Sequence, residues 1–120
     1  MSPAELLAEM ALLRVVVTAG TDGRPVLDGV FPDDLLGPAR TYRWLFVWGL
    51  EGAAGFRDTK TGRWVTHTWH TCDTCWKLQL LGTTRREPRR CSLTPGCPGR
   101  MRRAPTPAFR SSRTRLDQAS

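Results

Sequence analysis

The stretch that decides the fold begins with Cys72-Asp73-Thr74-Cys75 and ends with Cys91-Ser92-Leu93-Thr94-Pro95-Gly96-Cys97. It contains all four cysteines of the chain, in two close pairs that fifteen residues separate. Two pairs of thiolates on tight turns, joined by a hairpin, provide the ligands of a tetrahedral zinc site. Because four thiolates close the coordination shell of the ion, such a site is structural and not catalytic. The spacing therefore predicts a zinc ion bound by Cys72, Cys75, Cys91 and Cys97.

Several alternatives stay open, of which the simplest is that the cysteines are unligated thiols. Disulfides suit secreted chains, but the N-terminus has neither a basic start nor a cleavable apolar run, so we expect a cytoplasmic protein in which paired cysteines bind metal. Cys72-x-x-Cys75 alone would suit a redox pair, which would leave the second pair unexplained. Finally, His67 and His70 lie just upstream and could replace a cysteine as ligands.

Charge is distributed unevenly along the chain. Residues 1–54 carry four arginines and seven acids, whereas residues 55–120 carry fourteen bases and four acids. Arginine outnumbers lysine sixteen to two, which is typical of a GC-rich genome. On this composition we expect the source to be an actinobacterium or its phage or mobile element. Codon usage acts on both halves of the chain, so it does not explain the uneven charge. The asymmetry therefore predicts a partner with phosphates that meets the second half. No run of eighteen apolar residues exists, so we expect no membrane span.

The first residues predict a helix followed by a hairpin. Ser2 is a candidate N-cap, Pro3 suits the first helical position, and leucines and a methionine follow at helical spacing up to Leu13. The β-branched run 14–19 predicts a strand, and residues 25–30 predict its return after a turn at Asp22-Gly23.

Helices are predicted after the hairpin. Asp33 and Asp34 predict a short helical turn, which we expect Gly37-Pro38 to break. A longer helix should then run from Ala39 to about Leu50. Its predicted buried residues are Leu45 and Trp48, with Tyr42 and Phe46 as further candidates.

This α-β-β-α-α order over residues 2–52, with the opening Ser2-Pro3-Ala4-Glu5-Leu6-Leu7, resembles the TubC-type N-terminal docking domain. Those domains are small dimerising modules of assembly-line synthetases that bind the tail of a preceding subunit along a β-hairpin. No synthetase domain follows here, so the resemblance implies an association surface for a protein partner or a second copy, while a plain α+β fold without a partner stays open. The residues that it selects are Val15, Val17, Val26 and Val30.

A second hairpin is predicted over residues 56–70, with its turn at residues 58–63. Trp64, Trp69 and Trp76 lie close together in the sequence. They could all pack around a small metal core. Alternatively, Trp69 or Trp76 is exposed and stacks on unpaired bases.

The segment from Cys91 to Cys97 looks like the Cys-Ser-x-x-Pro-x-Cys knuckle of the zinc ribbons at the C-terminus of bacterial type IA topoisomerases, and Cys72 and Cys75 fit their first knuckle. Those ribbons bind single-stranded DNA through basic and aromatic residues. This chain departs from the pattern at Trp76, where a glycine usually follows the first pair, and at Thr94, where an aromatic residue is usual. The resemblance implies a ribbon but leaves its ligand open.

Arginines dominate the end of the chain. Residues 101–120 contain prolines and few apolar residues, so we expect a disordered basic tail. Together with the ribbon it predicts a nucleic-acid surface. The candidate residues are Trp69, Trp76, Lys77, Arg85, Arg86, Arg89, Arg90, Arg100, Arg102 and Arg103.

The sequence thus predicts an α+β protein in three parts: an acidic docking-like module (1–54), a β-hairpin with a four-cysteine ribbon (55–100) and a basic tail (101–120). No triad, phosphate-cradling loop or His-Glu-x-x-His motif is present, so we expect no enzyme. The predicted function is an accessory or regulatory factor that binds single-stranded DNA or RNA without sequence specificity. The alternative is an adaptor whose ribbon and tail bind an acidic partner, such as a polymerase or ribosome component.

Overall fold

Helix α1 (Pro3–Leu12) begins at the predicted N-cap. The Ser2 hydroxyl accepts a hydrogen bond of 3.2 Å from the backbone N–H of Glu5, and Pro3 occupies the first helical position. Leu6, Leu7 and Met10 are fully buried on one face of α1.

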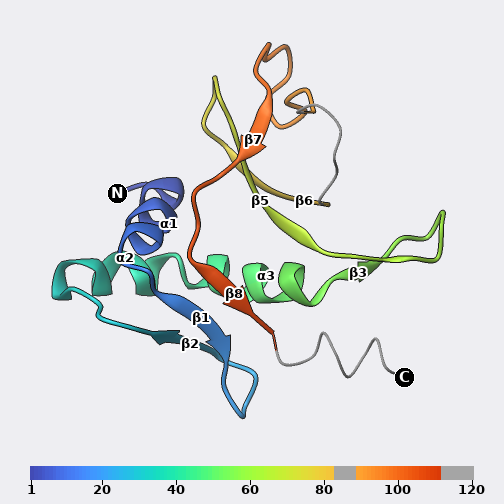
Figure 1. The fold of residues 1–120 in the computed structure, drawn as a ribbon. Coiled ribbons are helices and arrows are strands. Elements are labelled where there is room, and N and C mark those ends of the chain that lie inside the picture. Colours follow the sequence, from blue (N-terminus) through green and yellow to red (C-terminus); the bar gives the residue numbers. More distant parts are fainter. Residues whose placement is uncertain (83–88, 112–120) are drawn as a thin grey trace.

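The computed structural model describes residues 1–82 and 89–111, which form the predicted α+β fold (Figure 1).

The hairpin of strands β1 (Val16–Ala19) and β2 (Pro25–Asp28) is antiparallel, as predicted. Gly23 shapes its turn with a φ of 81°, a left-handed conformation that glycine adopts at little cost. Val15 and Val17 are buried, whereas Val26 and Val30 are exposed. The association surface predicted on all four valines is therefore wrong for Val15 and Val17, because the core already covers their side chains.

The helical segment breaks at a different point from the predicted one. After the short turn η1 (Asp33–Leu35), helix α2 (Leu36–Thr41) runs through Gly37-Pro38. Pro38 is tolerated because it lies in the first helical turn, where no N–H donor is required. The break falls at Tyr42, and α3 (Arg43–Ala54) extends past Leu50 until Gly55. Within the described residues, no helix has the length and apolar character needed to span a membrane.

Helix α3 presents two different faces. Leu45 and Phe46 are buried, but Trp48 is 52% exposed, so the prediction that Trp48 belongs to the core is wrong. Trp44, Trp48 and Glu51 follow one another at helical spacing and therefore share a separate stripe of the helix.

The second half of the chain forms two small sheets. Strands β3 (Phe56–Arg57) and β4 (Trp64–Val65) make the second predicted hairpin. Strand β5 (His67–Cys72) lies between β6 (Leu78–Gly82) and β7 (Met101–Arg103), and both pairings are antiparallel. Trp69 of β5 lies opposite Leu80 of β6, on the side that faces the helices.

Strand β8 (Ala108–Arg110) contradicts the disordered tail predicted for residues 101–120. It pairs in parallel with β1, so the first sheet has the order β2-β1-β8 (Figure 1). Phe109 anchors the strand against α3 at Gly49, where a Cβ atom would collide with the phenyl ring. Ala104 also packs against the core and Pro107 is buried, so the segment has several apolar contacts besides its pairing with β1. The predicted tail from residue 112 onwards lies outside the described residues.

One apolar cluster crosses the boundary predicted at residue 54. It joins Leu6 and Leu45 of the first half to Trp69 of β5, with Leu80 and Phe109 packed against it. A second, smaller cluster contains the four cysteines, Leu81, Leu93 and Met101. The division into three parts stays a prediction.

Two glycines allow a matched test of this packing. Gly49→Ala should lower the free energy of unfolding by about 1–3 kcal/mol, because the new methyl group overpacks against Phe109. Gly37→Ala is the control: beyond its chain neighbours no atom lies within 4 Å of the added carbon. It should change the free energy of unfolding by less than about 1 kcal/mol, because the gain of alanine in helix α2 is opposed by the ring of the following Pro38. Chemical denaturation of both variants measures the difference, and equal effects of the two would contradict the packing of β8 on α3.

Candidate metal centre

Two loops lie at one end of the β6-β5-β7 sheet (Figure 1). These loops bring the four cysteines together. Cys72 ends β5 and Cys75 lies in the turn before β6, while Cys91 and Cys97 bracket the turn before β7. The Cys72 and Cys97 sulfurs are 3.7 Å apart, and those of Cys75 and Cys91 are 3.6 Å apart. All four sulfurs lie within 4.8 Å of one another.

These distances fit a tetrahedral metal ion. Zn–S bonds of about 2.3 Å place two ligand sulfurs about 3.8 Å apart. A disulfide would require about 2.05 Å, and all four cysteines are free. The donor set of four thiolates is the one that zinc prefers in structural sites. The cysteines thus form a metal-binding cluster, as predicted, and the geometry suits zinc.

Backbone N–H groups point at the sulfurs. The N–H groups of Thr74 and Cys75 each donate to Cys72 Sγ at 3.4 Å, and that of Gly99 donates to Cys97 Sγ at 3.4 Å. Such donors stabilise the thiolate form that binds metal. Gly99 itself has no room for a side chain, because a Cβ atom there would collide with Cys72 Sγ and lie 2.9 Å from Thr74 Oγ1.

The thiols are not equivalent before metal binds. Thr94 Oγ1 has no hydrogen-bond partner of ordinary geometry within the described residues. A weaker interaction of this hydroxyl with Cys75 nevertheless lowers the pKa of the Cys75 thiol to about 6, and the Lys77 N–H acts in the same direction. The Gly99 N–H favours the Cys97 thiolate, yet burial and the neighbouring thiols prevail and raise the pKa of Cys97 to about 11. A divalent cation offsets the repulsion among the thiolates, because its positive charge stabilises the deprotonated form of each coordinating thiol.

Trp76 follows the first cysteine pair in a backbone conformation that favours glycine. Its φ is 63°, in the left-handed region, and its N–H donates to the Cys72 carbonyl at 3.1 Å to close the knuckle. Any side chain at this φ is strained. The indole is nevertheless 70% exposed and lies next to Lys77. Residue 76 therefore has a backbone conformation that glycine would adopt more easily than tryptophan.

Asp73 fastens the first knuckle to β7. Its carboxylate accepts hydrogen bonds from the Arg100 N–H at 2.9 Å and from Arg102 Nε at 3.2 Å. The Arg100 N–H, followed by Arg102 and the Thr74 hydroxyl, holds the pKa of Asp73 below its usual value although desolvation opposes the shift. Neither Asp73 nor Gly99 was predicted as a site residue, because their roles depend on contacts between the two knuckles.

Neither histidine belongs to the cluster. Nδ1 of His70 lies 2.9 Å from the Thr68 carbonyl, and Nδ1 of His67 lies 3.3 Å from the Val65 carbonyl. Across residues 1–82 and 89–111, the group of side chains that could hold a metal consists of the four cysteines alone.

The predicted nucleic-acid residues fall into three groups. Trp69 is only 3% exposed and meets Trp44 edge to face at 6.0 Å, so the core excludes it from base stacking. Arg85 and Arg86 lie outside the described residues. The remaining residues are all exposed at the ribbon: Trp76, Lys77, Arg89, Arg90, Arg100, Arg102 and Arg103.

Compared with protein-family models, curated proteins and solved structures, the chain gives no match. Both resemblances therefore stay predictions. The metal centre is assigned from the geometry of the four sulfurs alone.

Substitution of Trp76 tests the knuckle geometry. Trp76→Gly should raise the free energy of unfolding of the metal-loaded protein by about 1 kcal/mol, because glycine accepts the positive φ without strain. Trp76→Ala is the control, since it removes the indole but keeps the Cβ atom and should bring no such gain. Equal stability of the two variants would show that residue 76 is not in the left-handed conformation.

Proposed function

We propose that the protein is a small accessory or regulatory factor that uses a zinc ribbon to bind single-stranded DNA or RNA without reading its sequence. The observation that carries this proposal is an arginine pair across two neighbouring strands, Arg90 opposite Arg100.

The backbone places these two arginines on the same face. Hydrogen bonds from the Met101 N–H to the Arg89 carbonyl (2.8 Å) and from the Cys91 N–H to the Gly99 carbonyl (2.9 Å) flank the pair. This pattern defines a non-hydrogen-bonded pair, in which opposite side chains are closest. Like charges in such a pair destabilise the sheet, so an anion beside them is favourable. Phosphate groups are the anions that arginine recognises best.

The charge of the whole region supports a polyanionic ligand. Within residues 64–82 and 89–111, one lysine and six arginines face a single acid, Asp73. A zinc ion with four thiolates would carry a net charge of about −2 and neutralise part of this excess. The remaining positive charge is available to phosphates.

The ribbon offers little for reading a sequence. The described residues between 64 and 111 form strands and loops but no helix that could enter a major groove. In the proposed complex, arginines contact phosphates, the exposed Trp76 ring stacks on an unpaired base, and the metal ion holds both knuckles in place. Binding should therefore depend on charge and on strandedness.

The first sheet supports association with a second copy or another protein. Strand β2 is at its edge, and Val26 and Val30 remain exposed beside it. An edge strand with unpaired backbone groups is a common site of strand addition. This surface would link the nucleic-acid-binding ribbon to its partner.

A matched pair of double variants tests the proposal. Arg90→Gln with Arg100→Gln should reduce the slope of log affinity against log salt by about 1.4 for single-stranded DNA, since each lost phosphate contact contributes about 0.7. Arg40→Gln with Arg43→Gln removes the same charge from the helical segment and should leave the slope unchanged. Fluorescence anisotropy at several salt concentrations measures both, and RNA of the same length is compared.

Two results would contradict the proposed function. Equal losses in both double variants would show that net charge, and not the ribbon surface, governs binding. A folded, metal-loaded protein that binds neither DNA nor RNA would reject the proposal and favour the adaptor function.

A further inference from the structure

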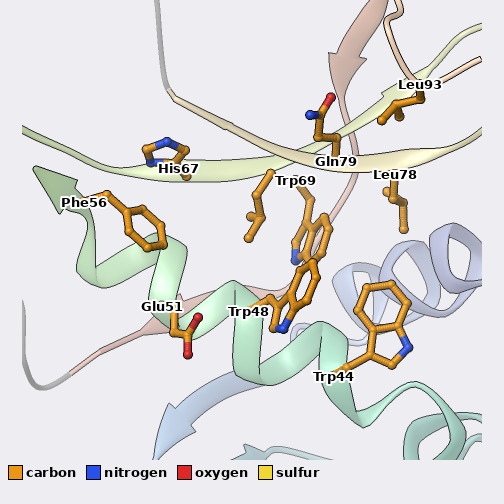
Figure 2. Close-up of a pocket in the computed structure, with 10 residues that line it drawn as sticks. Trp44, Trp48, Glu51, Phe56, His67, Trp69, Leu78, Gln79 and Leu93 are labelled. Carbon is orange, nitrogen blue, oxygen red and sulfur yellow. The ribbon is translucent and has the colours of Figure 1, made fainter. Parts of the chain in front are cut away.

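A groove of about 770 Å³ lies between α3 and strands β5 and β6 of the β6-β5-β7 sheet. Figure 2 shows Trp44, Trp48 and Glu51 projecting from α3 toward the sheet, with Trp69 and Phe56 on the opposite side. None of the four cysteines and none of the exposed arginines described above lines the groove, although Leu93 of the second cysteine turn does. It is built from the exposed stripe of α3 that the packing of the core leaves uncovered.

Three tryptophans and a phenylalanine line the groove together with three leucines. Trp44 and Trp48 meet edge to face at 5.6 Å, and Trp44 meets Trp69 in the same way at 6.0 Å. Trp44, Trp48 and Phe56 are 41%, 52% and 43% exposed. Ring faces that remain exposed attract cations through their negative quadrupole.

The charge of the groove has the opposite sign to that of the ribbon. Among the described residues that line it, Glu51 is the one formally charged residue, His67 is the other titratable one, and none is a lysine or arginine. This occurs in a chain with a net charge of +7. A groove with one carboxylate and several ring faces complements an organic cation, whereas a phosphate backbone would find no counter-charge here.

A buried donor in the groove also lacks an acceptor. Nε1 of Trp69 is buried and has no hydrogen-bond partner within the described residues. An unsatisfied buried N–H group is costly, so a ligand that brings a carbonyl oxygen gains from it. Trp69 and Glu51 are both among the residues that line the groove.

We propose that this groove binds a basic peptide segment through an arginine side chain. The guanidinium group lies over the Trp44 and Trp48 rings and pairs with the Glu51 carboxylate, because a planar guanidinium both stacks on indoles and forms paired hydrogen bonds with carboxylates. The Trp69 N–H donates to a backbone carbonyl of the peptide. This site is independent of the proposed nucleic-acid surface.

The test is a titration of the ¹⁵N-labelled, metal-loaded protein with the peptide acetyl-Ala-Arg-Ala-amide. The indole N–H signal of Trp69, assigned with Trp69→Phe, should shift in a saturable way. The same peptide with citrulline, which has the arginine shape without its charge, should bind much more weakly. Glu51→Gln should weaken binding of the arginine peptide about 5-fold, as expected for an exposed ion pair. Asp34→Asn, which removes a remote charge, should not.

Several outcomes would overturn the proposal. These are no shift of the Trp69 signal, equal binding of the citrulline peptide, or no effect of Glu51→Gln. A shift of the same signal with a short single-stranded oligonucleotide, or with protein concentration alone, would assign the groove to bases or to a second copy instead. Because Glu51→Gln should leave nucleic-acid affinity unchanged, failure here is distinguishable from failure of the proposed function.

Discussion

We propose that the second half of this molecule depends on the attraction between four clustered thiolates and a metal ion. Its strands are short, and its local apolar cluster consists of the cysteines, Leu81, Leu93 and Met101. Such a core is small for ordering two loops, so a metal ion bound there would contribute directly to folding. The knuckles also set the start of β7, and the chain continues from β7 into β8.

The two halves share a core, and this explains how a metal centre and a helical module form one structure. Trp69 belongs to the strand that ends at Cys72, yet it packs among the residues of α1 and α3. Gly49 and Gly52 allow β8 and β5 to approach α3 closely, since a Cβ at Gly52 would lie 2.8 Å from the His67 carbonyl. The same packing leaves Trp44, Trp48 and Glu51 on the outside. The molecule consequently presents a basic ribbon on one part and an acidic aromatic groove on another.

Local signals in the sequence predicted the elements that depend on local physics. The Ser2 cap, the Asp22-Gly23 turn and the four cysteine ligands were found because each requires only neighbouring residues or a fixed spacing. The parallel pairing of Val16 with Ala108 was missed, because it joins opposite ends of the chain and depends on the Phe109 contact with Gly49. Trp48 was assigned to the core because apolar character alone does not say which of two apolar helix faces is covered. The roles of Asp73, Thr94 and Gly99 in the centre were likewise invisible, since they act between loops that only the fold brings together.

The central claim is that the cysteine cluster holds one zinc ion that maintains the fold. The most direct measurement is the metal content of the purified protein by mass spectrometry, with near-ultraviolet circular dichroism of its tryptophans before and after chelation. The account predicts one zinc per chain and loss of the tryptophan signal when the metal is removed, because Trp69 is ordered by the strand that ends at Cys72. A protein without bound metal, whose tryptophan signal is unchanged by chelator, would contradict it.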